Sequence, residues 1–170
     1  TDLEDRLQYS LPAIISGKMP IIPLRDISEI KTVAIMRKDF LGALIKAIPL
    51  RSNNSKEYPY GSSTIDVYGV EPRGIEIGQT FVLSSKILGI MSGMTSVFRD
   101  FAMKGLSKMP PSMVYGCDLK GNSVMALYVP PLVEHHQAAS VLLDGMHRSY
   151  ICRAAGTTVN AVHIFDVSIP

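Results

Sequence analysis

In the run Leu142-Leu143-Asp144-Gly145-Met146-His147-Arg148, a β-prone apolar segment ends and a helical segment begins. The residues that continue it, His147–Ala155, have the length of a short helix, and Gly156 is a typical C-terminal cap. Thr158–Ile164 is rich in β-branched residues and alternates, which is typical of a strand. The stretch Val141–Ile164 therefore predicts a strand, a glycine turn, a short helix and a second strand.

The turn before the predicted helix has the properties of an anion site. Gly145 has no Cβ atom, so it adopts a positive φ easily and allows close approach to the backbone. The first N–H groups of the helix, from about Met146, have no acceptor within the helix, and the helix dipole adds partial positive charge there. These properties together favour a bound phosphate or carboxylate.

Three side chains of the turn suit such a ligand. Arg148 offers a forked set of donors that matches phosphate or carboxylate oxygens. His147 can donate a hydrogen bond, act as an acid or base near neutral pH, or bind a metal. Asp144 can cap the helix or hold Mg²⁺ through water. The same residues also fit a plain helix with Asp144 as its cap and Arg148 in solvent, so both interpretations stay open here.

The overall composition is that of a folded protein. The chain has 170 residues, of which 46% are hydrophobic and 19% charged, and this excludes a disordered chain and suits one domain with an ample core. The formal net charge of +2 is too small by itself to indicate a nucleic-acid partner.

Cysteine usage and hydropathy predict a cytoplasmic protein. Cys117 and Cys152 lie far apart and form no CxxC pattern, which indicates two free thiols in a reducing compartment. The longest apolar runs, such as Val124–Val133, are broken by prolines and fall short of the roughly 18 residues of a membrane span. The acidic start Thr1-Asp2-Leu3-Glu4 is not typical of a signal peptide, so we expect no membrane partner.

Helix and strand signals also mark the rest of the chain. Thr1 and Glu4 form a capping-box pattern that predicts a short helix through Leu11. Met19–Leu24 contains two prolines and predicts an edge strand or an extended entry segment. The other predicted elements are helices over Thr32–Ile48 and Thr95–Lys108, strands over Thr64–Val70 and Gln79–Leu83, and a hairpin of Met113–Cys117 with Ser123–Val129.

The triplet Glu134-His135-His136 resembles a cluster of metal ligands. Zinc sites need three or four ligands at suitable spacing, and adjacent histidines of a strand point to opposite faces. We therefore predict surface or loop-edge residues, one of which can still face the anion site because the triplet shortly precedes the motif strand.

Three short segments together resemble the ParB/sulfiredoxin superfamily. Leu143–Tyr150 matches its His-Arg turn between a strand and a helix, Ala154–Thr157 its Ala-x-x-Gly helix end, and Val159–Val162 the strand that follows. Ile22–Ile27 is similar to the opening strand of the family and the polar turn after it. No resemblance covers the sequence between the opening strand and the motif.

The resemblance implies an α/β (α+β) fold in which a small mixed sheet carries flanking helices. Residues 1–170 would form a single domain, with family-like core elements at 19–30 and 141–164. Residues 50–130 exceed the usual connection of the family and would be an elaboration or insert.

In nucleotide-using members of the superfamily, this turn binds nucleotide phosphates. The resemblance therefore implies phosphate binding by Gly145, Met146, His147, Arg148 and Ser149. Sulfiredoxins have their catalytic cysteine where this chain has Met146, so we expect no sulfiredoxin activity.

The free serine kinases of the superfamily imply catalytic residues as well. They have a catalytic Glu soon after the first strand, for which Glu29 is the nearest candidate here, and a solvated turn carboxylate is the alternative. A kinase needs Mg²⁺ to bridge phosphates and a carboxylate to accept the hydroxyl proton. The candidate catalytic residues are thus Glu29, Asp144 and His147, with Asp144 also a candidate Mg²⁺ ligand and ATP, ADP or CTP as the nucleotide.

The sequence leaves three functions open. The first is binding of a nucleotide or phosphorylated small molecule, with or without phosphotransfer or nucleotide hydrolysis. The second is a DNA-associated or regulatory module of the same fold, which is not favoured because the chain has neither a helix-turn-helix module nor a dense basic helix. The third places the function in the inserted middle. The sequence predicts neither the substrate nor the oligomeric state.

Overall fold

The computed structural model describes residues 19–48, 57–77, 85, 88 and 108–167, which fall into two compact units. The first unit comprises Thr1–Ile65, Pro111–Tyr128 and Ile164–Pro170, and the second comprises Asp66–Pro110 and Val129–His163. The helices and two sheets confirm a mixed α/β fold. Within the described residues, no helix has both the length and the apolar character that crossing a bilayer requires. The predicted elements over 1–11, 79–83 and 95–107 lie outside the described residues.

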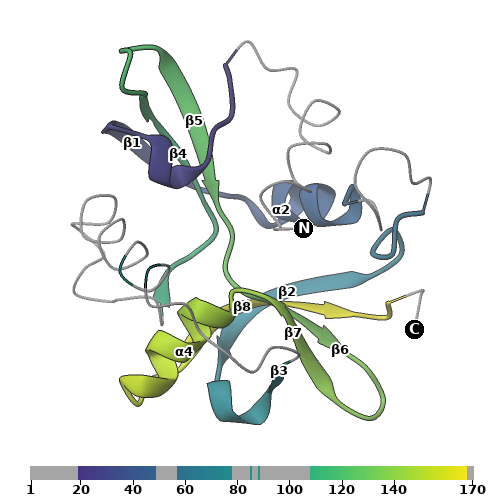
Figure 1. Ribbon diagram of the computed structural model, residues 1–170. Helices are drawn as coiled ribbons and strands as arrows, with labels where there is room; N and C mark the ends of the chain where they lie inside the picture. The colour runs from purple at the N-terminus through teal and green to yellow at the C-terminus, as the bar shows by residue number, and fades with distance from the viewer. Residues whose placement is uncertain (1–18, 49–56, 78–84, 86–87, 89–107, 168–170) are drawn as a thin grey trace. The chain divides into compact units, whose positions relative to one another are not determined.

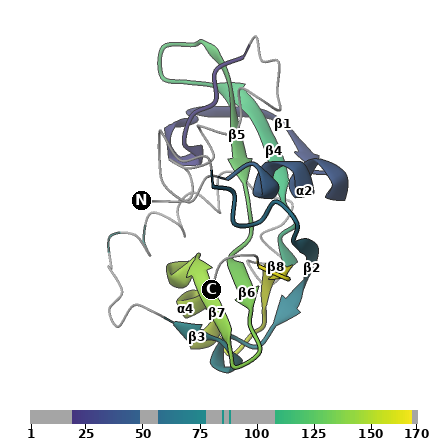
Figure 2. The same cartoon turned by 90° about the vertical axis from the view of Figure 1, so that its right-hand side faces the viewer.

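The first unit contains a three-stranded antiparallel sheet in the order β1-β4-β5 (Figure 2). Its strands are β1 (Glu29–Ile35), β4 (Ser112–Cys117) and β5 (Ser123–Tyr128), so the predicted hairpin is confirmed. The hairpin turn is held by Asp118, whose carboxylate accepts hydrogen bonds from the backbone N–H groups of Lys120 and Asn122. The side-chain amide of Asn122 also donates to it, and these bonds lower the pKa of Asp118.

The entry segment of this unit is extended, in keeping with the prediction for Met19–Leu24. Ile21 forms an isolated parallel bridge with Met125 of β5. A short 3-10 helix, η1 (Leu24–Asp26), then leads into β1.

The predicted helix over Thr32–Ile48 is wrong in its first part. Its N-terminal residues belong to β1, and the helix α2 covers only Lys38–Lys46, after Arg37 in extended conformation. Helical spacing of apolar residues continued by coincidence into a segment whose backbone groups pair with β4. Sheet pairing with a distant strand therefore overrode the local pattern. Within α2, Leu41, Leu44 and Ile45 are buried.

The second unit holds most of a five-stranded mixed sheet in the order β2-β8-β6-β7-β3 (Figure 1). Strand β3 runs parallel to β7, whereas β6 and β7 form an antiparallel hairpin. A core cluster of Ile75, Val133, Leu142 and Ala161 is buried in this unit. The strands are β2 (Thr64–Val70), β3 (Glu76–Ile77), β6 (Leu132–His135), β7 (Ser140–Asp144) and β8 (Val159–Phe165), with the 3-10 helix η2 (Pro72–Gly74) and the helix α4 (Met146–Ala154).

Candidate functional site

The predicted strand, glycine turn, helix and strand are present as β7, Gly145, α4 and β8. Gly145 is the N-cap of α4 and has a left-handed conformation with φ 83° and ψ 24°. No side chain caps the helix, and its first backbone bond runs from the Ser149 N–H to the Gly145 carbonyl at 2.9 Å. Of the two roles considered for Asp144, that of helix cap is not seen, because Gly145 takes the cap position.

The predicted glycine cap at the other end of α4 is confirmed. Gly156 has φ 69°, and its N–H donates to the Arg153 carbonyl at 3.1 Å. The Thr157 N–H donates to the Cys152 carbonyl at 2.9 Å. These two bonds form a Schellman motif, which satisfies the last carbonyls of the helix.

Arg148 is held by two oxygen acceptors. Its Nη2 donates to Oδ2 of Asp144, the last residue of β7, at 3.0 Å. Its Nη1 donates to the Val129 carbonyl. The Arg148 and Asp144 side chains are only 15% and 26% exposed. Arg148 is thus not a solvated helix residue. Its guanidinium is fixed beside the turn, and part of its donor fork is already engaged by a carboxylate.

The other predicted ligands of the turn have different degrees of burial. His147 is partly exposed in the first turn of α4, and Met146 begins that helix. Ser149 is only 2% exposed, and its Oγ has no hydrogen-bond partner among the described residues. A buried hydroxyl without a partner costs about 1–3 kcal/mol, so Ser149 is an unusual feature of this helix.

The predicted catalytic residues belong to two different units of the structure. Glu29 is exposed at the start of β1 in the first unit, whereas Asp144 and His147 belong to the second. In the parts of the chain that the structure describes, no group of three or more His, Cys, Asp or Glu side chains is arranged to hold a metal ion. A Mg²⁺ site at Asp144 thus remains a prediction.

A second polar cluster lies at the hairpin end of β6 and β7. His135 Nε2 lies 2.7 Å from His163 Nδ1, and His135 Nδ1 lies 2.9 Å from the Ser140 hydroxyl. His163 Nε2 lies 3.1 Å from the Tyr68 carbonyl oxygen, and the two rings stack with centroids 3.5 Å apart. Sequence reasoning missed this cluster, because His163 comes from β8 and only the sheet order brings it beside β6.

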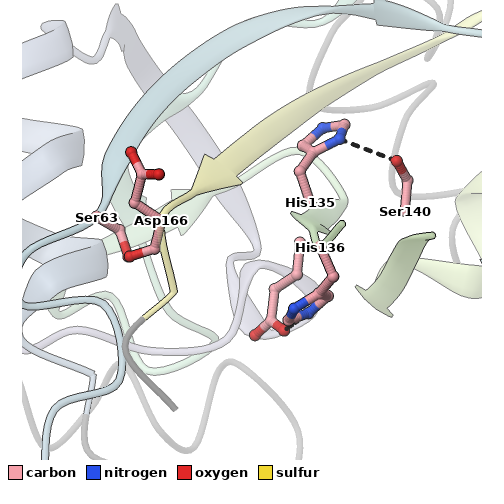
Figure 3. A network of polar contacts seen from close by, with 6 residues as sticks. Ser63, His135, His136, Ser140 and Asp166 are labelled. Atoms are coloured by element: carbon pink, nitrogen blue, oxygen red, sulfur yellow. Dashed lines mark hydrogen bonds and ion pairs between the residues drawn. The ribbon is translucent and has the colours of Figure 1, made fainter. Parts of the chain in front are cut away.

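Strand geometry separates the two adjacent histidines, as predicted. Figure 3 shows His135 and His136 directed to opposite sides, with the bond from His135 to Ser140 dashed. His136 instead pairs with the Glu134 carboxylate at 2.8 Å. His135 is the last residue of β6 and is partly exposed, as expected for a loop-edge residue, and it also contacts the fully buried His163.

Burial controls the ionisation of this cluster. It lowers the pKa of His163 most, and the nearby His135 lowers it further against opposing effects of the Tyr68 carbonyl and Asp66. Burial also lowers the pKa of His135, with a smaller contribution from His136. Both imidazoles therefore favour their neutral form in the folded protein.

The two cysteines are free, as the sequence predicted, and both are buried. Burial raises the pKa of the Cys152 thiol, which outweighs the hydrogen bond with Thr157 and the charge of Arg148. A thiol with a raised pKa is a poor nucleophile, so Cys152 acts as a core residue of α4.

The chain was compared with protein-family models, curated proteins and solved structures. No protein-family model, curated protein or solved structure matches this chain. Two sites thus remain for chemical interpretation: the turn between β7 and α4, and the histidine cluster at the hairpin end.

Proposed function

We propose that the chain binds a nucleotide or another phosphorylated ligand at the turn between β7 and α4. The observation that carries this proposal is the left-handed Gly145 at the start of α4, without a capping side chain. The N–H groups of a first helical turn have no acceptor within the helix and carry partial positive charge. An anion at this end satisfies both properties.

Arg148 supports the proposal through its position. Its guanidinium is anchored by the Val129 carbonyl, so little side-chain entropy remains to be lost when a ligand binds. Asp144 accepts from the same guanidinium and therefore competes with a phosphate for its donors. Asp144 would then either yield to the phosphate or hold Mg²⁺ between itself and the ligand.

Ser149 and His147 supply further polar groups near the helix start. The buried Ser149 hydroxyl, which has no partner among the described residues, would gain a hydrogen bond if a ligand oxygen reached it. His147 is partly exposed and can carry a proton near neutral pH. Phosphotransfer or nucleotide hydrolysis at this turn would use His147 or Asp144 as the proton acceptor, with Mg²⁺ on the phosphates.

Calorimetric titration tests the binding. ATP, ADP and CTP are titrated with and without Mg²⁺ into the wild-type chain, His147→Ala and Arg148→Lys, which keeps the charge but loses the fork. Arg153→Ala is the matched control, because Arg153 is exposed in the last turn of the same helix. We expect nucleotide affinity to fall about tenfold in His147→Ala and in Arg148→Lys, and to stay unchanged in Arg153→Ala.

Asp144→Asn separates the two roles of the carboxylate. If Asp144 only competes for Arg148, the variant binds Mg²⁺-free nucleotide more tightly than wild type. If Asp144 holds Mg²⁺, the variant loses the Mg²⁺-dependent part of the affinity. Nucleotide binding that is unchanged in the His147 and Arg148 variants would contradict the proposed site. Salt-sensitive binding of duplex DNA without nucleotide binding would favour the DNA-associated alternative instead.

A further inference from the structure

The cluster at the hairpin end forms one directional chain of hydrogen bonds. The Tyr68 carbonyl can only accept, so His163 Nε2 carries the proton of that bond. In neutral His163, Nδ1 is then an acceptor, and His135 Nε2–H donates to it. Neutral His135 is left with a lone pair on Nδ1, which accepts from the Ser140 hydroxyl.

We propose that these hydrogen bonds make Ser140 a nucleophile for ester hydrolysis, with His135 as its general base and His163 as a positioning residue. A hydroxyl hydrogen-bonded to an imidazole that a third group orients is the arrangement that activates serine in acyl transfer. Here a carbonyl and a second imidazole fix the orientation of His135. The substrate class is a carboxylic ester.

The residues of this hydrogen-bonded series differ in burial. Ser140 and His135 are partly exposed, whereas His163 is fully buried and stacked on the Tyr68 ring. The two reacting residues are thus partly exposed, and the orienting group is in the interior, where stacking on Tyr68 holds its ring. Ser140 and His135 also face each other as a register pair of the β6–β7 hairpin, which fixes both backbones.

This site is distinct from the phosphate turn. Ser140 begins β7 and Asp144 ends it, so the two sites are four residues apart along one strand. At about 3.3 Å per residue, the separation is about 13 Å. Loss of either activity can therefore be measured without the other.

The proposed step balances without a cofactor. Ser140 Oγ attacks the ester carbonyl carbon and forms a C–O bond, while its proton moves to His135 Nδ1. The tetrahedral intermediate collapses, its bond to the alcohol oxygen breaks, and His135 returns the proton to that oxygen. Water then attacks the acyl-serine with His135 again as base, which releases the carboxylic acid and restores the Ser140 hydroxyl.

Labelling with a fluorophosphonate probe tests the nucleophile. The probe phosphonylates activated serines with loss of fluoride, and peptide mapping by mass spectrometry locates the adduct. We expect modification of Ser140 in the full chain and its absence in Ser140→Ala. Ser123→Ala, which removes an exposed serine at the start of β5, is the matched control and should label like wild type.

Hydrolysis of p-nitrophenyl acetate tests the base. His135→Ala should lower the rate about 100-fold, within the range of general base catalysis. His136→Ala is the matched control, because it removes an imidazole from the adjacent position on the opposite side. Equal rates for both variants would show that no specific base acts at Ser140 and would overturn the proposal.

The pH profile tests the positioning role of His163. The wild-type rate should rise with pH and level off below the ordinary histidine value, as His135 loses its proton. His136 and Glu134 beside His135, and Asp66 near His163, are the titratable neighbours in this cluster, and both His163 variants keep them. In His163→Asn, the amide oxygen can still accept from His135 Nε2, so the rate should stay within about tenfold of wild type.

His163→Leu removes the acceptor and completes the test. We expect a rate at least ten times lower than that of His163→Asn and a midpoint shifted in pH. If His163→Leu does not fold, the labelling of Ser140 and the contrast between His135→Ala and His136→Ala still decide the proposal. Absence of any Ser140 adduct in the folded wild-type chain would refute it.

Discussion

Gly145 lies so close to Pro131 that a Cβ atom on this glycine would stand 2.6 Å from two ring carbons of the proline. The Pro131 carbonyl in turn accepts the Val162 N–H of β8 at 2.8 Å. The start of α4 is thus fixed against a residue that is itself bonded to the sheet. Glycine is needed at position 145 both for its positive φ and for this contact.

Gly145→Ala should therefore destabilise the protein by about 2–4 kcal/mol, from left-handed strain and overpacking together. Gly156→Ala is the matched control, because Gly156 also has a positive φ but the described part of the chain places no atom within 4 Å of the added Cβ. It should cost only about 1 kcal/mol. Urea denaturation of both variants measures the difference, and equal losses would contradict the packing role of Pro131.

In the first unit, Gly116 is likewise a position where an added Cβ atom would meet the backbone of another strand. A Cβ atom there would lie 1.9 Å from the Glu29 carbonyl oxygen, where β1 pairs irregularly with β4. Gly116→Ala should shift β1 and destabilise the protein by about 3 kcal/mol or more. Gly42→Ala in α2, where no atom of the described residues lies within 4 Å of the added Cβ, should instead stabilise the protein by up to about 1 kcal/mol. Thermal denaturation checks both signs.

The pair of Asp144 and Arg148 should couple measurably. A double-mutant cycle with Asp144→Ala and Arg148→Ala should give a coupling energy of about 1–2 kcal/mol, because both side chains are largely shielded from water. Arg148→Ala should cost more than Asp144→Ala, since it also removes the donor to the Val129 carbonyl. A coupling energy near zero in urea denaturation would mean that the ion pair does not form in solution.

Acid should destabilise the second unit through its buried histidine. The pKa of His163 is lowered in the folded protein, whereas its unfolded value is about 6.5. The unfolded state therefore binds more protons below about pH 6.5, and stability falls as the pH decreases from there. His163→Asn should flatten this slope between pH 7 and 5. Calorimetric melting across this range measures both slopes.

Local sequence alone determined the β7–Gly145–α4–β8 unit, because its signals lie within a few residues of one another. The apolar strand, the left-handed glycine and the Schellman end at Gly156 need no distant partner to be predicted. The hairpin of β4 and β5 was predicted from the sequence for the same reason, since its turn residues separate two β-prone runs.

Long-range contacts decided what the sequence did not. β1 is a strand because its backbone pairs with β4, more than 70 residues away in the chain, and a helical spacing cannot reveal that partner. Arg148 is engaged because the turn brings it to the Val129 carbonyl as well as to Asp144. His135 and His163 meet because β8 lies beside β6 in the sheet. The sequence determines which chemical groups the side chains carry. The neighbours that set the charge and orientation of those groups depend on strand order, which only the tertiary structure provides.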